Sequence, residues 1–230
     1  MQTTLVHQTL VGLSGLVLAV ASHAARPLVT DDTGVLDQGS CELEAVLSRD
    51  KADGAQVDGK SLQLGCGVGA RTQVALAVDR AKEDTLRVRG TTLAGKVSLL
   101  TGDDASWSAS GAVLWTAVPG QGNEHAATSV NLLHTRVLRK QFTLHANLGH
   151  VQDAVARRAA TTWGLALEHA GWGPVALMGE LIGDDLDAPA WNIGLRWTAV
   201  PDKLTLDIAY GQQMVGGRPK ALSLGVKLSF

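Results

Sequence analysis

The sequence predicts an all-β fold: a transmembrane antiparallel β-barrel of about 12 strands, with both chain termini on the periplasmic side. Three observations predict it. Apolar and polar residues alternate with period two from residue 41 to the end, charged residues stay on one of the two alternating faces, and aromatic residues fall near the ends of the expected strands. The 26 glycines among 230 residues agree with a β-rich chain, because glycine usually makes up about 7% of residues.

The N-terminus carries the features of an export signal. An apolar run, Leu10–Val20, precedes the small residues Ser22 and Ala24, which fit a cleavage site before Ala25. We therefore expect residues 1–24 to be a signal peptide. Residues 25–39 follow as a periplasmic or plug segment, and residues 40–230 as an outer-membrane barrel. The expected localisation is the outer membrane of a Gram-negative bacterium.

The expected strands differ in the clarity of their alternation. The last one is the clearest, since Leu224, Val226 and Leu228 occupy one face and Gly225 and Lys227 the other. The segment 128–137 alternates ambiguously and is assigned from its neighbours. In chain order the segments are 41–47, 62–68, 74–78, 93–99, 107–115, 128–137, 142–148, 163–168, 177–181, 191–197, 204–210 and 222–230.

Alternation alone does not say which face points outward, so a soluble sandwich or lipocalin-like barrel is the alternative. Connection lengths and aromatic positions favour the membrane barrel, in which apolar residues face lipid. We expect long connections near 50–60, 80–90, 117–125, 151–160, 184–190 and 212–220, and short ones near 68–71, 101–105, 138–141, 170–174 and 199–203. The aromatic residues then form two rims, with Trp107, Phe142, Trp172, Trp197 and Phe230 at the short-turn end and Trp115, Trp163, Trp191 and Tyr210 at the other.

The polar face supplies the residues expected to line the lumen as a solute path. They are Glu42, Glu44, Asp79, Lys96, His145, Asn147, Glu168, Glu180, Arg196, Asp207 and Lys227. Carboxylates outnumber cations among them, which favours cationic or neutral solutes over anions. The alternative is that these side chains neutralise one another in a packed polar interior that leaves no channel.

Two further features lie near the start of the expected barrel. Arg26, Asp31 and Asp32 belong to a segment that could act as a plug or gate, with its carboxylates meeting Lys96, Arg196 or Lys227; the alternative is a simple tether. Cys41 and Cys66 face each other on the first two strands, and export exposes them to an oxidising compartment. A disulfide between them is one prediction, and two free thiols are the other.

Catalytic and metal-binding chemistry has little support in the sequence. His145 and Asn147 are near neighbours, with His134 and His150 close in sequence, but no serine lies in a nucleophile motif and no carboxylate clearly orients a histidine. The scattered histidines and the two cysteines lack the spacing of a metal site. We expect no enzyme, no cofactor and, at a net charge of −2, no nucleic-acid partner.

Two motifs resemble known families. The final residues 222–230, ending in Phe230, resemble the terminal strand that the barrel assembly machinery recognises, which implies that machinery and outer-membrane lipid as partners. The stretch 25–34 (ARPLVTDDTG), with Gly39 and the Glu-Leu-Glu of 42–44, resembles the opening of the family labelled MetA pathway of phenol degradation. The stretch 147–150 (NLGH) resembles that family as well. This resemblance implies an outer-membrane barrel that passes small, often aromatic, compounds.

The expected function is therefore passive uptake of small solutes, hydrophobic or aromatic ones included, through an outer-membrane channel. A structural or interaction barrel with a closed lumen is the second hypothesis, and a membrane-embedded hydrolase is the third. The sequence names neither the substrate nor the oligomeric state.

Overall fold

The computed structural model describes residues 26–52, 55–118, 126–214 and 219–230. The expected signal peptide, residues 1–24, lies outside the described residues. Within the described ranges, no helix is long and apolar enough to cross a membrane.

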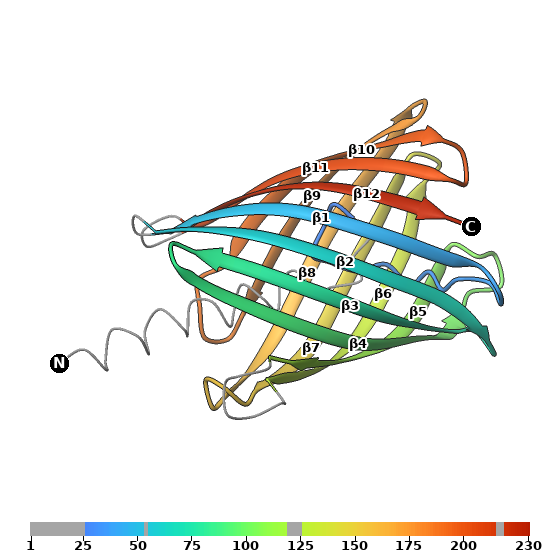
Figure 1. Cartoon of the computed structure of the whole chain (residues 1–230). Helices are drawn as coiled ribbons and strands as arrows, with labels where there is room; N and C mark the ends of the chain where they lie inside the picture. Colours follow the sequence, from blue (N-terminus) through green and yellow to red (C-terminus); the bar gives the residue numbers. More distant parts are fainter. Residues whose placement is uncertain (1–25, 53–54, 119–125, 215–218) are drawn as a thin grey trace.

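Twelve antiparallel strands form one closed barrel (Figure 1), as the sequence predicts. Each strand pairs with its neighbours in sequence, and β1 closes the ring against β12. Closure leaves no strand edge unpaired, which a lipid environment requires because it offers no water to backbone groups. The strands are β1 (Cys41–Ala52), β2 (Ala55–Gly69), β3 (Thr72–Glu83), β4 (Leu86–Thr101), β5 (Trp107–Ala117), β6 (Ala127–Arg139), β7 (Phe142–Asp153), β8 (Arg158–Trp172), β9 (Val175–Asp184), β10 (Ala190–Val200), β11 (Leu204–Gln213) and β12 (Lys220–Ser229).

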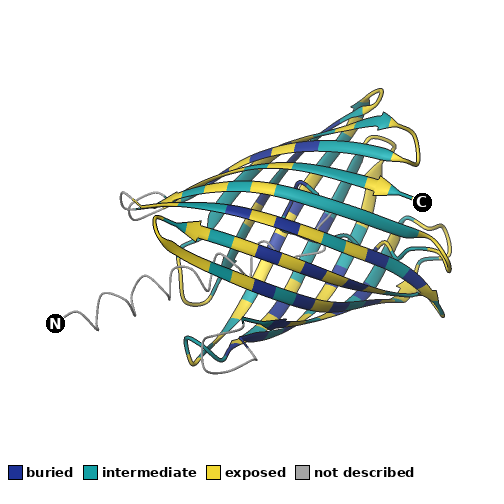
Figure 2. Cartoon of the chain, in the orientation of Figure 1, coloured by how far each residue is buried: buried dark blue, intermediate teal, exposed yellow. Residues whose placement is uncertain are grey.

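The apolar face of the strands points outward. Along β3, Leu76 and Val78 are 52% and 49% exposed, whereas the residues between and after them, Ala77 and Asp79, are 1% and 5% exposed. The same alternation of exposed and buried residues recurs around the barrel (Figure 2). A soluble barrel would bury its leucines and expose its charges, so the predicted inverted polarity is confirmed.

Aromatic side chains lie toward the two ends of the strands. Trp107 opens β5 and Trp115 lies near its end, while Phe142 and Trp172 stand at a terminal position of β7 and β8. Trp191 near the start of β10 stacks edge-on with Tyr210 of β11, with ring centroids 5.7 Å apart. Rims of aromatic residues are typical of barrels whose outer surface meets a membrane interface at both ends.

The predicted contrast between long and short connections is wrong in part. Residues near 50–60 and 80–90, expected to be long loops, continue the strands, and β3 turns into β4 through residues 84–85 alone. Backbone pairing does not depend on apolar side chains, so the paired strands continue through polar residues beyond the apolar band. Arg49 and Asp58, for example, pair across β1 and β2 with Nε and Oδ1 2.8 Å apart.

The two ends of the barrel sequence meet at one rim. The N–H of Cys41 donates to the carbonyl of Phe230 (2.7 Å), and the N–H of Phe230 donates to the carbonyl of Cys41 (2.9 Å). At the same rim Cys41 is bonded to Cys66 in a disulfide, with a Cα–Cα distance of 4.1 Å. This crosslink joins β1 to β2 where the chain enters the barrel.

Candidate functional site: the lumen and its inner segment

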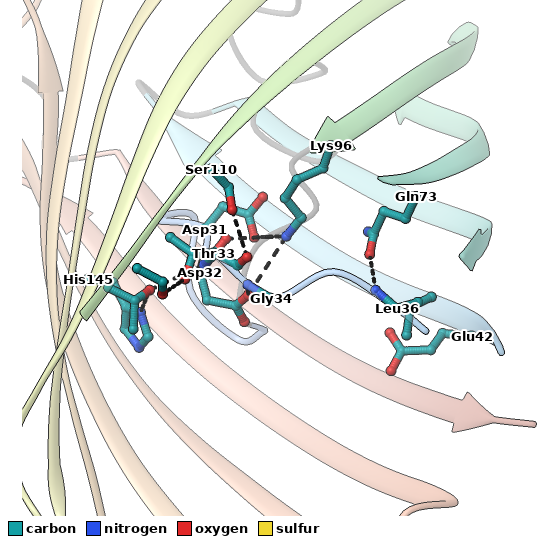
Figure 3. Close-up of polar contacts among 12 residues, drawn as sticks. Asp31, Asp32, Thr33, Gly34, Leu36, Glu42, Gln73, Lys96, Ser110 and His145 are labelled. Carbon is teal, nitrogen blue, oxygen red and sulfur yellow. Dashed lines mark hydrogen bonds and ion pairs between the residues drawn. The ribbon is translucent and has the colours of Figure 1, made fainter. Parts of the chain in front are cut away.

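Residues 26–39, named here the inner segment, lie inside the barrel (Figure 3). Their contacts move from β11 at the start of the segment to β2 at its end. Arg26 contacts Asp207 of β11, Val29 and Thr30 contact β9, Leu36 contacts β3, and Gly39 contacts β2. The segment therefore runs around the inner wall before the chain enters β1.

The start of the inner segment is held by an arginine–carboxylate pair. Arg26 donates from Nε and Nη2 to the two carboxylate oxygens of Asp207, at 3.2 and 2.9 Å. The backbone carbonyl of Arg26 accepts a hydrogen bond from Nε of Arg196 (2.7 Å), whose Nη1 also pairs with Glu168 (3.3 Å). Such two-point pairing fixes the orientation of the guanidinium as well as its distance.

Glu180 binds the backbone of the inner segment directly. Its two carboxylate oxygens accept the N–H groups of Val29 (2.8 Å) and Thr30 (2.7 Å), and one also accepts from Asn192 (2.9 Å). Beside these bonds, Leu28 packs in a small apolar cluster with Ala166, Ala176 and Met178. A buried carboxylate needs hydrogen-bond donors or a cation to replace its lost hydration. For Glu180, the backbone N–H groups of Val29 and Thr30 supply two of the three donors named above.

Lys96 of β4 holds the acidic part of the inner segment. Its ammonium lies 3.1 Å from Oδ1 of Asp31 and 3.7 Å from Oδ1 of Asp32, and it also donates to the carbonyl of Asp32 (3.2 Å). Burial raises the pKa of Asp31 to about 7, and the Lys96 charge opposes that rise. The carboxylate of Asp31 thus depends on Lys96 for its negative charge near neutral pH.

The middle of the inner segment is bound by hydroxyl groups of the wall. The carbonyl of Thr33 accepts a hydrogen bond from the Ser110 hydroxyl (2.7 Å), and the N–H of Thr33 donates to Thr135 Oγ1 (3.2 Å). Its hydroxyl also contacts that of Ser108. In the amide orientation that satisfies both groups, Asn147 accepts from the N–H of Asp31 (2.6 Å) and donates to its carbonyl (2.9 Å).

Glycines in the wall make room for the inner segment. A Cβ at Gly164 would lie 2.6 Å from the hydroxyl oxygen of Thr30, and one at Gly194 would overlap Pro27. These glycines sit inside strands, where glycine is otherwise disfavoured because it offers no side chain for packing. The close approach of the Thr30 and Pro27 side chains explains them, and glycine inside a strand is a signal in the sequence for such an approach.

The residues predicted to line the lumen divide into two groups. Most lie in contacts with the inner segment or with one another; Lys227, for example, pairs with Glu42 at 3.1 Å. Of the three cations expected to meet the acidic residues of the segment, Lys96 does so, Arg196 binds a backbone carbonyl, and Lys227 does neither. Asp79 stands apart, because both its oxygens are buried without a hydrogen-bond partner among the described residues.

Among the described residues, His145 is the candidate histidine with contacts to other polar groups of the predicted lumen. Its Nδ1 lies 3.0 Å from the Thr135 hydroxyl and its Nε2 lies 3.8 Å from Glu168. The Thr135 hydroxyl already accepts the N–H of Thr33, so the inner segment covers this chain of contacts. No group of three or more His, Cys, Asp or Glu suited to a metal ion occurs among the described residues.

Comparison with solved structures shows which fold the chain shares with known proteins. The KdgM porin in complex with disordered oligogalacturonate has a TM-score of 0.66 at 10% sequence identity, covering 82% of this chain and 99% of that chain. The COG4313 outer membrane channel from Pseudomonas putida F1 has a TM-score of 0.66 at 11% identity, covering 86% and 98%. The NanC porin has a TM-score of 0.60 at 13% identity, covering 81% and 98%. At such identities the likeness is one of fold, and the fold is that of outer-membrane barrel channels.

The family is shown by sequence. The chain belongs to the family described as uncharacterised conserved protein UCP029691, whose family model matches residues 13–230. No curated protein matches the sequence. The resemblance to the phenol-degradation family stays a prediction.

The contacts of Glu180 predict how firmly the inner segment is held. We expect a cysteine at position 28, introduced as Leu28→Cys, to react slowly with a water-soluble maleimide, because residue 28 is 3% exposed. Adding Glu180→Ala leaves the N–H groups of Val29 and Thr30 without acceptors. This loss destabilises the bound position of the inner segment by about 3 kcal/mol and should therefore speed labelling about 100-fold.

Glu42→Ala serves as the matched control, because Glu42 bonds Lys227 and Ser229 rather than the inner segment. Labelling at position 28 should keep its slow rate in that background. Equal labelling rates with and without the Glu180 carboxylate would contradict its role in holding the inner segment against the wall.

Proposed function

We propose that this chain is an outer-membrane channel for passive uptake of small neutral or cationic solutes, hydrophobic and aromatic compounds among them. The observation that carries the proposal is the inverted polarity of a closed barrel, with leucine and valine outside and ionic groups inside. We further propose that residues 1–24 direct export and are removed, that the barrel assembly machinery recognises the strand ending in Phe230, and that both termini of the mature chain face the periplasm.

The charges inside the barrel support a preference against anions. Four cations inside the barrel each have a carboxylate partner: Arg26 with Asp207, Lys96 with Asp31, Arg196 with Glu168, and Lys227 with Glu42. By contrast, Asp79 of β3 and Asp50, which alternates inward on β1, have no lysine or arginine partner among the described residues. Any uncompensated charge on these groups is therefore negative, and such a carboxylate attracts a cation whenever it is ionised.

Neutral aromatic solutes are compatible with this charge pattern. The motif at residues 25–34 resembles a family associated with phenol degradation, and a neutral phenol meets no repulsion from carboxylates. Diffusion through a channel needs oriented polar groups and a path, and needs no nucleophile or metal. The substrate class thus rests on the motif and the lumen charges together.

The inner segment supports a role as a constriction or gate. It runs along the wall from β11 to β2, so it narrows the lumen along most of the circumference. Its anchors are ion pairs and hydrogen bonds to individual wall side chains, which can be exchanged for water one at a time. We propose that displacement of this segment controls the width of the path.

A closed structural barrel is the second candidate. Wall residues such as Ser110, Ala77, Thr92 and Ala166 are at most 1% exposed, as in a filled interior. A barrel of that kind would bind partners through its connections and pass no solute. Conductance separates the two candidates.

Deletion of residues 26–36 tests the role of the inner segment. We expect the shortened protein to show a larger single-channel conductance in planar bilayers than the full mature chain, because the deletion removes the backbone that lies against the wall. Heat-dependent gel mobility and circular dichroism verify that the barrel still folds. Conductance that stays unchanged would exclude the gate, and no conductance from either protein would favour the closed barrel.

Ion selectivity tests the lumen charge. We expect the channel to prefer K⁺ over Cl⁻ in a salt gradient, and Asp79→Asn to lower the permeability ratio about fivefold, since one charge near an ion contributes about 1 kcal/mol in water. Asp84→Asn is the control, because Asp84 lies in the β3–β4 turn with φ 48°, a conformation that asparagine tolerates. A ratio below one for the wild-type protein would overturn the charge argument.

A further inference from the structure

Five basic residues gather on the outer surface of β2, β3 and β4, beside the hairpin at residues 84–85. Lys60 pairs in register with Arg80, and Arg80 with Arg89; one step further, Lys82 pairs with Arg87. All five side chains are exposed. We name this set (Lys60, Arg80, Lys82, Arg87 and Arg89) the basic ladder.

The basic ladder is electrostatically unfavourable within the protein alone. Like charges directly opposite each other on neighbouring strands destabilise a sheet. Among the described residues none of the five has an ion-pair partner, and Asp58, which lies in register with Lys82, is already bound to Arg49 at 2.8 Å. The uncompensated charge is therefore positive over several paired positions, on a chain whose net charge is −2.

The basic ladder begins where the apolar band ends. Two residues along the strands from Lys60 and Arg80 stand Leu62 and Val78, which pair with each other and are 46% and 49% exposed. Trp115 lies in register with Leu93 a little further along the band. Two residues of a strand span about 7 Å, so the basic side chains stand at the depth of lipid headgroups when the band lies in hydrocarbon.

We propose that the basic ladder binds the phosphate groups of lipid A, the phosphorylated glycolipid of the outer leaflet. The proposal rests on the proposed outer-membrane function, with the 84–85 hairpin on the external side. Arginine and lysine bind phosphate through charge-assisted hydrogen bonds, and arginine does so with two parallel bonds. The bound phosphates would supply the negative charge that the ladder lacks, while the acyl chains pack against Leu62, Val78 and the leucines beyond them.

Binding of lipid A to the full mature protein in neutral detergent tests the site. We expect the protein to bind diphosphorylated lipid A, and the triple variant Lys60→Gln, Arg80→Gln, Arg89→Gln to bind it about 100-fold more weakly, as each basic residue contributes about 1 kcal/mol at an anionic lipid surface. The single variant Arg80→Gln should show an intermediate loss. In the absence of lipid, the triple variant should unfold at a temperature no lower than the wild-type protein, because the substitutions relieve repulsion.

The matched control removes three basic residues at the opposite rim: Arg136→Gln, Arg139→Gln, Lys140→Gln, at the end of β6 and in the turn after it. This variant should bind lipid A like the wild-type protein. Equal affinity of wild-type and triple variant would overturn the proposal, and so would equal affinity for lipid A lacking its phosphates. Competition by inorganic phosphate or phosphatidylglycerol at matched concentration would show a general anion site and would also overturn it.

The outcome is independent of the conductance experiments, which use bilayers without lipid A. A protein that conducts but does not bind lipid A would refute the lipid site alone. A protein that binds lipid A but does not conduct would refute the channel and leave the lipid site standing.

Discussion

The rest of the structure depends on one constraint. Because the barrel is closed and its exterior is apolar, ionic side chains of the membrane-spanning region must lie in its interior. The cost of a buried unpaired charge then applies to every inward-facing position. Several of these charges are satisfied by the inner segment rather than by another residue of the wall. Asp207, Glu180 and Lys96 each find a partner on it.

The inner segment therefore links folding to function. The wall groups that hold it are the Arg196 guanidinium, the Lys96 ammonium, the carboxylates of Glu180 and Asp207 and several hydroxyls, and a polar solute would meet these groups in the absence of the segment. Gly164 and Gly194 show that the wall is shaped for the segment, because a side chain at either position would collide with it. An occupied lumen and a wall shaped to fit its occupant support the proposed gate, and Asp79 remains without a hydrogen-bond partner among the described residues.

Periodicity in the sequence was sufficient to predict the number of strands and which residues share a face, because side chains alternate between the two faces of a strand. The outward direction of the apolar face was predicted from the aromatic positions and from the connection lengths, of which the latter were wrong in part. The facing positions of Cys41 and Cys66 followed from the same register. The strand ends could not be predicted, because Arg49, Asp58 and Arg80 lie in polar stretches that read as loop yet pair as strand. The path of the inner segment could not be predicted either, because its hydrogen-bond partners lie up to 181 residues away in the sequence. The basic ladder could not be predicted for a related reason, because its residues are dispersed in the sequence and become neighbours only through the strand register.

Oxygen accessibility of spin labels along β3 tests the inverted polarity most directly. Single labels at Val74, Ala75, Leu76, Ala77 and Val78 would be measured by electron paramagnetic resonance in reconstituted bilayers, with the native disulfide intact. The account predicts that molecular oxygen, which partitions into lipid, relaxes the labels at positions 74, 76 and 78 strongly and those at 75 and 77 weakly. The opposite phase, or no period of two, would contradict it.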